Sequence, residues 1–424
     1  MEKKAFREIT AMHGHNYPDF GIRIMKHQVI YPTPGDSVII TRREADRMDN
    51  NAGNTEILVY YFPQYHPDAR NDKARGKGWT EWELVKAAKP RFPGHRQPKV
   101  PAWGYFDESD PDWAAKEIAL AADHGVTGFL FDWYYYEDGP FLQDALERGF
   151  LKAPNCDRLK FALMWANHDW EDIHPDGLAR PRKILFPGRV SVAGFERVTR
   201  HVIRDFFTKP NHLTVGGEPF FSIFDVGTFI SGLGGLDGAR KALARFRADT
   251  RAAGFPGLHL NAITWKDIVL GDGKKSHFQA VEEMGFSSAG NYTWIQNYEM
   301  KEFPIDDYHL MAEAMYVHWE DQRRGYKVPF FPNVTMGWDS SPRTDQTEEF
   351  KNRGYPWIPV LGGNTPEAFR GALQRAKAFV NTLPAGQRLV TINAWNEWTE
   401  GSYLLPDTEQ GKAYLEAIGK IFGK

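Results

Sequence analysis

The sequence predicts a (β/α)8 barrel with enlarged loops, and three observations support this fold class. From about residue 57 onward, short runs rich in β-branched and aromatic residues alternate with amphipathic helical runs. The strand-like runs are nearly continuously apolar, which is typical of parallel strands covered on both faces. Eight strand–helix pairs occupy roughly 370 residues, a number and length that suit this barrel.

The eight predicted strands are short apolar runs that end in polar or aromatic residues. In chain order they are 57–62 (ILVYYF), 127–133 (TGFLFDW), 160–166 (KFALMWA), 219–225 (PFFSIFD), 258–264 (LHLNAIT), 285–292 (GFSSAGNY), 329–338 (PFFPNVTMGW) and 388–395 (RLVTINAW). Helical patterns lie between them, and several begin after an Asp, Ser or Thr that can cap the first turn. A final helix is predicted in TEQGKAYLEAIGKIFG, after the eighth strand.

An open, doubly wound sheet is the competing architecture for the same alternation. Such a sheet commonly carries a Gly-rich phosphate turn after its first strand, whereas this chain has YYFPQYHPD there. The barrel is therefore favoured, with residues 56–424 as the catalytic barrel. Residues 1–55 do not follow the alternation and are predicted to be an N-terminal extension of unknown role, with a candidate strand pair in HQVIYPTPGDSVIIT.

Composition narrows the classes of partner and compartment. The net charge of -3 gives no basic face for nucleic acid, and a single cysteine, Cys156, cannot form an internal disulfide or a thiolate metal cluster. No apolar run approaches the ~18 residues of a membrane helix, so no membrane span is predicted. The start, MEKKAFREIT, lacks the apolar stretch of a secretory signal. The compartment stays open: periplasmic or extracellular if a signal was removed, otherwise cytoplasmic. The oligomeric state is also open.

Active-site groups of a (β/α)8 barrel lie at the C-terminal ends of the strands, and polar and aromatic residues gather at these positions here. The predicted substrate-binding residues are Tyr65, His66, Glu81, Trp82, Asp132, Trp133, Tyr134, Trp165, Asn167, Tyr292, Trp294, Trp338, Asp339, Arg343, Trp395 and Asn396. Asp225 ends the fourth predicted strand, and Trp265 follows the fifth. A lone Trp at a strand end more often packs than binds, and Arg343 could instead pair with Asp339. Indoles that stack on sugar rings, beside polar groups for hydroxyls, nevertheless indicate a carbohydrate cleft.

Two glutamates, Glu397 and Glu400, follow the eighth strand in NAWNEWTEG. Glycoside cleavage needs a proton donor and a group that activates a nucleophile, commonly two carboxylates. Burial beside Trp would raise the pKa of one carboxyl and keep it protonated near neutral pH. The structural alternative is an acid that stabilises the start of a helix. Two carboxyls this close in one loop need not lie on opposite sides of a bond, so their spacing leaves the mechanism open.

Other catalytic chemistries have weaker signals. The candidate metal ligands are His66, His95, His168, Asp169 and His174, but no H-E-x-x-H or comparable spacing occurs. A serine hydrolase would need a G-x-S-x-G turn, which is missing, and Cys156 lies in a predicted helix-to-strand loop. No metal and no cofactor are therefore predicted.

Six motifs together resemble the WbsX-like proteins, a bacterial group related to glycoside hydrolase family 99. They are YYFPQYHPD, GKGWTEW, KPRFPGHRQPKVP, MWANHDW, GWDSSPR and NAWNEWTEG, in that order between about residues 57 and 410. The resemblance implies a (β/α)8 barrel and an endo-acting, retaining α-mannosidase-like reaction through a 1,2-anhydro sugar. It implies that Glu397 removes the proton of the sugar's 2-hydroxyl and that Glu400 is the general acid/base. Such a mechanism prefers an axial 2-hydroxyl trans to the leaving group, as in α-mannosides and α-rhamnosides.

The expected function is thus a retaining glycoside hydrolase acting on an α-linked oligosaccharide or polysaccharide. WbsX-like sequences are often labelled glycosyltransferases, and an enzyme of surface polysaccharide synthesis is one alternative. A nucleotide-sugar enzyme usually needs a diphosphate site, through a metal-binding acidic motif or a Rossmann-type turn, and the sequence contains neither. A non-catalytic carbohydrate-binding barrel is the other alternative. The sugar and its linkage stay open.

Overall fold

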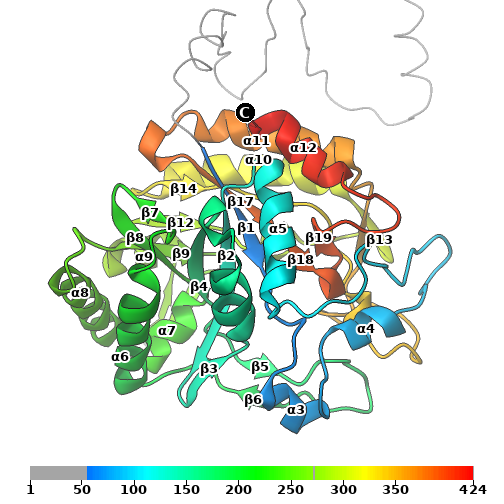
Figure 1. Ribbon diagram of the computed structural model, residues 1–424, viewed down its shortest axis with the longest axis horizontal. Coiled ribbons are helices and arrows are strands. Elements are labelled where there is room, and N and C mark those ends of the chain that lie inside the picture. The colour runs from blue at the N-terminus through cyan, green and yellow to red at the C-terminus, as the bar shows by residue number, and fades with distance from the viewer. Residues whose placement is uncertain (1–54, 271–272, 424) are drawn as a thin grey trace, which may run out of the picture. The chain divides into compact units, whose positions relative to one another are not determined.

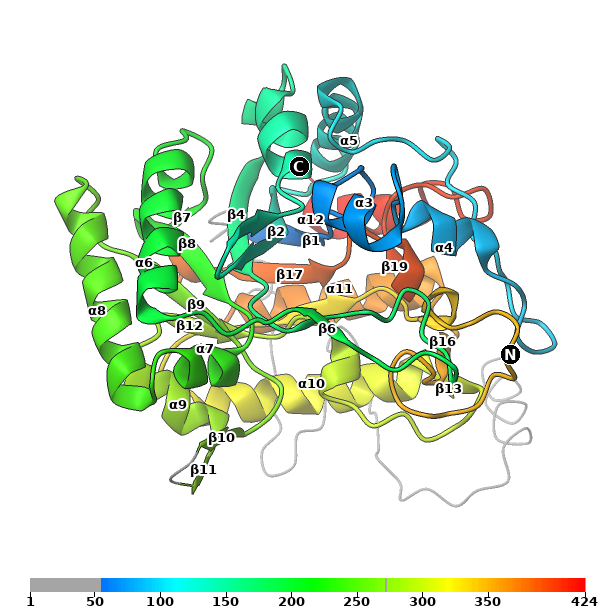
Figure 2. The ribbon, with the colours of Figure 1, turned by 90° about the horizontal axis from the view of Figure 1, so that it is seen from below.

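The computed structural model describes residues 55–270 and 273–423. The strand pair predicted in the N-terminal extension lies outside these residues. The described chain forms a nearly closed barrel of parallel strands with helices around it (Figures 1 and 2), which confirms the predicted fold class. Among the described helices, none combines the length and the hydropathy needed to cross a membrane.

Nine strands occupy eight positions around the barrel, in chain order. They are β1 (Glu56–Tyr61), β2 (Gly128–Tyr136), β4 (Lys160–Trp165), β8 (Glu218–Ile223), β9 (His259–Ile263), β12 (Ser288–Gly290), β14 (Phe330–Phe331), β15 (Asn333–Thr335) and β17 (Leu389–Asn393). Every neighbouring pair is parallel, and β17 returns to pair with β1. Each predicted strand is therefore present, although the sixth is shorter than predicted.

The seventh position is divided because a proline interrupts it. β14 pairs with β12, and β15 pairs with β17, with Pro332 between them. Proline has no N–H to give to a neighbouring strand. Its carbonyl still accepts a hydrogen bond from the backbone N–H of Thr391 at 3.0 Å, so the chain carries the barrel across the interruption.

Helices cover the outside of the barrel. They are α5 (Pro111–Asp123), α6 (Val192–His201), α7 (Val226–Gly232), α8 (Leu236–Ala252), α9 (His277–Met284), α10 (Tyr308–Gly325), α11 (Pro366–Val380) and α12 (Ala413–Phe422). Capping side chains begin many of them: Asp110 accepts from Asp112 N, Ser191 from Gly194 N, and Thr365 from Ala368 N. In Figures 1 and 2, α6 and α8 lie side by side outside β4 and β8.

The loops at the barrel ends carry further short elements. They are α3 (Ala69–Arg75), α4 (Trp82–Ala87), β3 (Gly139–Phe141), β5 (Trp170–Glu171), β6 (Ile184–Phe186), β7 (Thr214–Val215), β10 (Ile268–Leu270), β11 (Gly273–Lys275), β13 (Ile305–Asp307), β16 (Val360–Gly362), β18 (Asn396–Glu397) and β19 (Ser402–Tyr403). Most of them follow the C-terminal ends of the strands, where the enlarged loops were predicted.

Side chains alternate along each strand between the barrel interior and the layer under the helices. On β2, Leu130 packs inside the barrel, whereas Phe129 and Phe131 pack in the outer layer. On β4, Met164 points inward and Trp165 outward. This alternation decides which residues at the strand ends can reach a site on the barrel axis.

Candidate active site

A cavity of about 630 Å³ lies at the C-terminal ends of the barrel strands. The ends of β2, β4 and β8 contribute to its wall, together with the loops that follow β12, β15 and β17. Its charged and aromatic lining residues are Phe62, Asp132, Tyr134, His168, Asp169, Trp170, Glu171, His174, Phe224, Tyr292, Trp338, Arg343, Tyr355, Glu397 and Glu400. The cavity therefore combines aromatic walls with a concentration of carboxyl groups.

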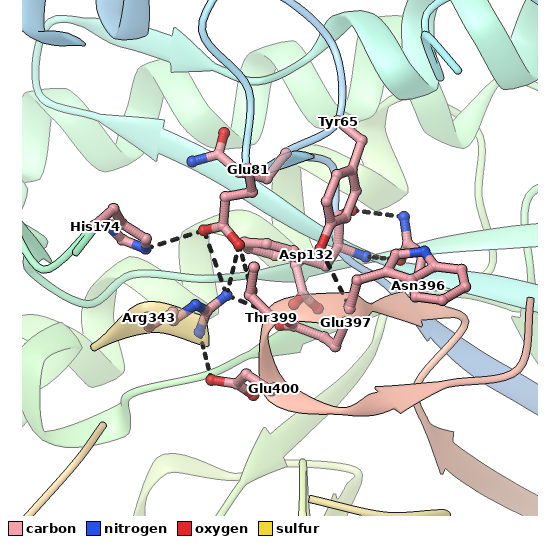
Figure 3. Close-up of polar contacts among 12 residues, drawn as sticks. Tyr65, Glu81, Asp132, His174, Arg343, Asn396, Glu397, Thr399 and Glu400 are labelled. Atoms are coloured by element: carbon pink, nitrogen blue, oxygen red, sulfur yellow. Dashed lines mark hydrogen bonds and ion pairs between the residues drawn. The ribbon is translucent and has the colours of Figure 1, made fainter. Parts of the chain in front are cut away.

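Arg343 is the centre of this carboxyl cluster (Figure 3). Its Nη1 donates to Glu400 Oε1 at 2.5 Å, and its Nη2 donates to Glu397 Oε2 at 3.1 Å and to Glu81 Oε2 at 3.2 Å. All four side chains are buried. Arg343 thus holds both candidate catalytic glutamates and does not pair with Asp339, which instead accepts from His95 and Gln97.

Glu81 is the permanent counterion of Arg343. Burial opposes ionisation of Glu81, but the attraction of Arg343 and hydrogen bonds from His174 and Thr399 lower its pKa to about 2. His174 Nε2 lies 3.0 Å from Glu81 Oε1, and burial lowers the pKa of His174. His174 is therefore neutral near neutral pH, and Arg343 is the cation that keeps Glu81 ionised. Little positive charge is left to stabilise two further carboxylates.

Glu397 and Glu400 consequently have pKa values above the ordinary glutamate value. Burial raises the pKa of Glu397, and repulsion from Glu400 raises this pKa further, although Arg343 opposes both effects. Burial also raises the pKa of Glu400, but Arg343 and a 2.7 Å hydrogen bond from the Tyr355 hydroxyl limit the rise. A proton shared by this pair therefore favours Glu397 in the ligand-free protein.

A third carboxyl, Asp132, is connected to Glu397 through Tyr292. The Tyr292 hydroxyl lies 2.8 Å from Asp132 Oδ2 and 3.0 Å from Glu397 Oε1. A hydroxyl has one hydrogen, so Tyr292 can donate to only one of these oxygens. The other contact is a hydrogen bond only when its carboxyl is protonated. Burial raises the pKa of Asp132 well above its ordinary value, which fits a proton held within this chain of three groups.

The loop that carries the two glutamates is fixed from both sides. Tyr65 accepts a hydrogen bond from the backbone N–H of Trp398 at 3.1 Å, between the two glutamates. Asp339 N donates to the backbone oxygen of Glu400 at 2.6 Å. Gly401 follows with a φ of 62°, and a Cβ there would lie 2.8 Å from Asp339 N. The glycine of the NAWNEWTEG motif therefore permits the close approach that sets the position of Glu400.

The predicted site residues divide into three groups in the structure. Seven line the cavity: Asp132, Tyr134, Tyr292, Trp338, Arg343, Glu397 and Glu400. Two others lie behind this lining: Glu81 accepts a hydrogen bond from the lining residue Arg343, and Tyr65 accepts one from the backbone N–H of Trp398, between the two lining glutamates. The remaining nine do not line the cavity, for reasons that differ between polar and aromatic residues.

The polar residues outside the cavity tie strand ends together. Asn396 exchanges two hydrogen bonds of 2.8 Å with the backbone of Phe62, and Asn167 does the same with Asp225. His66 bonds to the buried Glu108 at 2.9 Å. The structure therefore places His66, Asn167 and Asn396, together with Asp339, in supporting contacts.

The aromatic residues outside the cavity are packed in the core. Trp82, Trp165, Trp294 and Trp395 are buried, and each indole N–H donates to a protein oxygen away from the cavity. Trp133 is also buried, with its ring against His201. Trp133 and Trp165 occupy outward positions of β2 and β4, so strand alternation turns them toward the helices.

Several lining residues were not among the predicted set. Trp170, His168 and His174 follow β4, and Trp170 stacks on His174 with ring centres 5.5 Å apart. His168 and Trp170 belong to the MWANHDW motif, so the motif was a usable signal for them. Tyr355 lies in the long loop after β15, within a stretch that has no recognisable pattern, and only the fold brings it to Glu400.

The candidate metal ligands are dispersed. His66, His95 and His174 pair with three different carboxyls, Glu108, Asp339 and Glu81. Within residues 55–270 and 273–423, no group of three or more His, Cys, Asp and Glu side chains has an arrangement suited to a metal ion.

Comparisons with known proteins agree with the resemblance drawn from the sequence motifs. A family model described as "Glycosyltransferase WbsX" matches residues 57–418. Over 367 residues the chain is 29% identical to an "Uncharacterized protein WxcX" of Xanthomonas campestris pv. campestris strain B100. This match covers 85% of the chain and 48% of the relative, so the chain spans about half the length of the curated relatives it matches.

Solved structures share the barrel fold at low sequence identity. A family 99 endo-α-mannosidase from Bacteroides thetaiotaomicron aligns with a TM-score of 0.52 at 13% identity, covering 86% of this chain and 96% of the other. A protein described as "Glycoside hydrolase-like protein" aligns with a TM-score of 0.57 at 12% identity, covering 87% and 94%. At these identities the likeness establishes the fold alone.

Proposed function

Because this chain belongs to the family described as glycosyltransferase WbsX and has a barrel fold found among glycoside hydrolases, we propose that it is a retaining glycoside hydrolase of α-linked glycans. The observation that carries the proposal is the position of Glu397 and Glu400. Both line one cavity, both contact Arg343, and both have a pKa raised chiefly by burial.

In the proposed first step the substrate supplies the nucleophile. Glu397 removes the proton of the 2-hydroxyl, and O2 attacks the anomeric carbon. The glycosidic C–O bond breaks as Glu400 gives its proton to the leaving oxygen. The products of this step are a 1,2-anhydro sugar and a free hydroxyl on the departing chain. Neither carboxylate has to reach the anomeric carbon, so two glutamates in one loop can serve.

In the second step Glu400 takes a proton from water, and the hydroxide attacks the anomeric carbon. The C1–O2 bond opens, and O2 regains a proton from Glu397. Two inversions at the anomeric carbon give net retention of configuration. An α-mannoside or α-rhamnoside, with its axial 2-hydroxyl, has the geometry that this scheme requires.

These roles need a proton on Glu400 and an ionised Glu397, the reverse of the preference in the ligand-free protein. Substrate binding supplies the reversal. A 2-hydroxyl that donates to Glu397 favours its ionised form, and a leaving oxygen that accepts from Glu400 favours its protonated form. The Tyr292–Asp132 pair offers a second place for the proton that Glu397 releases.

The charges of the cavity favour a sugar over a sugar nucleotide. Of the described residues that line it, five carry carboxyl groups and Arg343 carries the one guanidinium. That guanidinium already contacts three glutamates. A diphosphate would meet repulsion here, whereas neutral hydroxyls find acceptors. The family description nevertheless makes a glycosyltransferase the second candidate, and a non-catalytic carbohydrate-binding barrel is the third.

One experiment separates these candidates. The protein is incubated with α-mannan, α-rhamnan and related glycans without any sugar nucleotide, and reducing ends are measured. Release that disappears in both Glu397→Gln and Glu400→Gln supports hydrolysis. The matched control is Glu416→Gln, an exposed glutamate of α12, which should keep full activity. Turnover only with an added sugar nucleotide would contradict the proposal, and glycan binding without turnover would favour the third candidate.

A further inference from the structure

A second cavity, of about 320 Å³, lies at the ends of β8 and β9, on the same end of the barrel as the first. The loop after β9 supplies Trp265 and Lys266 to its lining, and the loop before α6 supplies Arg189. Asp225, the N-cap of α7 just after β8, belongs to this lining, whereas its neighbour Phe224 belongs to that of the first cavity. The two cavities therefore share one stretch of chain.

A row of aromatic rings connects the second cavity to Glu397. The ring centres of Trp265 and Phe224 are 4.7 Å apart, and those of Phe224 and Tyr292 are 5.5 Å apart. Tyr292 ends the row with its hydroxyl 3.0 Å from Glu397 Oε1. The row runs from one cavity to the candidate catalytic carboxyl without a gap in ring contact.

Trp265 differs from the indoles that pack the core. Trp165 and Trp294 are buried, and their N–H groups donate to backbone oxygens. Trp265 is only partly buried, and none of the described residues accepts a hydrogen bond from its Nε1. Lys266 Nζ lies 5.4 Å from the centre of the Trp265 ring, and Phe224 packs against the same ring, so the indole is partly covered. The part that remains exposed in the cavity suits the C–H face of a sugar ring.

Polar groups suited to hydroxyls surround this indole. Arg189 and Lys266 are exposed, and among the described residues neither has a hydrogen bond or an ion pair. Asp225 uses one oxygen, Oδ1, to cap Thr228 N at 2.8 Å, which leaves Oδ2 as an acceptor. Donors and an acceptor thus flank an aromatic platform, as in a pyranose-binding site.

We propose that the second cavity is a sugar subsite in which Trp265 stacks on one pyranose ring of the chain whose bond lies beside Glu397 and Glu400. The inference rests on the proposed function and deepens it. The substrate is then an oligosaccharide or polysaccharide that spans both cavities, and a single glycoside fills only the first.

Binding of an oligosaccharide length series tests this subsite. α-Mannan and α-rhamnan oligosaccharides of increasing length are titrated calorimetrically into the Glu400→Gln protein, which binds without turnover. Affinity should rise when the chain becomes long enough to reach Trp265. Adding Trp265→Leu, which keeps apolar volume against Phe224 but removes the ring, should weaken the longer ligands about three- to tenfold and leave the shortest unaffected. Trp265→Phe should restore part of the loss.

The control is Trp103→Leu, a partly buried tryptophan that belongs to neither cavity. Equal affinities of the Trp265→Leu and parent proteins for every length, with unchanged thermal unfolding, would overturn the subsite while the proposed function stands. If Trp265→Leu weakens binding of the longer ligands but the unaltered protein never releases reducing ends, the result supports the subsite and contradicts hydrolysis. An affinity that never rises with length would overturn the subsite directly.

Discussion

Arg343 forms ion pairs with three carboxyl groups in one buried cluster, those of Glu81, Glu397 and Glu400. A buried ion pair is weak evidence for stability, because desolvation can cost more than the attraction returns. The arrangement is better understood through pKa values. Glu81 neutralises Arg343, so Glu397 and Glu400 keep a pKa above the ordinary glutamate value. The pair thereby keeps a proton to a higher pH than an exposed glutamate would.

The distinct roles of the two glutamates predict different responses to the leaving group. Replacing a general acid/base commonly costs about 10²–10⁴-fold in rate. An aryl glycoside with an activated leaving group needs no proton from Glu400, so Glu400→Gln should recover much of its rate on that substrate. Glu397→Gln should not recover, because the 2-hydroxyl still requires a base. The measurement is kcat/KM on activated and unactivated substrates for each variant.

Equal recovery of both variants would show that the roles are assigned wrongly. A substrate that lacks its 2-hydroxyl provides the matched control on the ligand side. It should not turn over in any variant, because the proposed nucleophile is missing. Turnover of such a substrate by the unaltered protein would exclude the 1,2-anhydro route.

At the level of elements, a buried acid joins helix α5 to two barrel strands. Glu117 of α5 accepts hydrogen bonds of 3.0 Å from Tyr61 of β1 and from Trp395, just beyond β17. Burial raises the pKa of Glu117 to about 8. The folded protein therefore keeps a proton on Glu117 over a pH range in which the unfolded chain has released it.

This shift predicts how stability depends on pH. Between the ordinary glutamate pKa of about 4.5 and the folded value of about 8, the unfolded chain binds fewer protons, so stability falls as pH rises. The limiting slope from one such group is about 1.4 kcal/mol per pH unit. Glu117→Gln resembles the protonated acid and should flatten the decline of unfolding free energy between pH 5 and pH 8.

Urea denaturation at several pH values measures this slope. The exposed Glu416→Gln variant serves as the control and should show the pH dependence of the unaltered protein. If Glu117→Gln has the same slope as the unaltered protein, Glu117 is ionised in the folded state, and the link between α5 and the barrel is a charged one.

At the scale of the whole molecule, the eight strand positions and the candidate site lie within residues 56–424. The family match begins at residue 57 and ends at 418. We propose that residues 55–424 fold without the first 54 residues of the chain. A chain of residues 55–424 should then unfold within a few degrees of the full chain and keep its glycan binding, as measured by thermal denaturation and calorimetry.

A further truncation to residues 63–424 is the informative control. It removes β1, which pairs with both β2 and β17, and so opens the barrel. This chain should lose cooperative unfolding. If the 55–424 chain also fails to unfold cooperatively, the proposed division into an extension and an independent barrel is wrong.

The strand positions were predictable because burial on both faces leaves a local mark. Runs such as ILVYYF and RLVTINAW are apolar enough to be identified without knowing their neighbours, and both became barrel strands, β1 and β17. The apolar pattern predicted strand bounds less reliably where a strand forms only two or three residue pairs with its neighbour. The predicted sixth strand, 285–292, is reduced to β12, and Pro332 divides the seventh.

The sequence by itself determined the barrel and the end of it where active-site residues gather, because the apolar pattern of each strand is a local property. It also determined Glu397 and Glu400 as the candidate catalytic residues, because both lie in one motif directly after the eighth strand. Only the tertiary structure decided which side chains reach the cavity. Asp132 and Trp133 are adjacent in sequence, yet alternation turns the first toward the barrel axis and the second toward the helices. Tyr355 reaches Glu400, and Trp265 joins Phe224 and Tyr292, through contacts between distant segments that closure of the barrel creates.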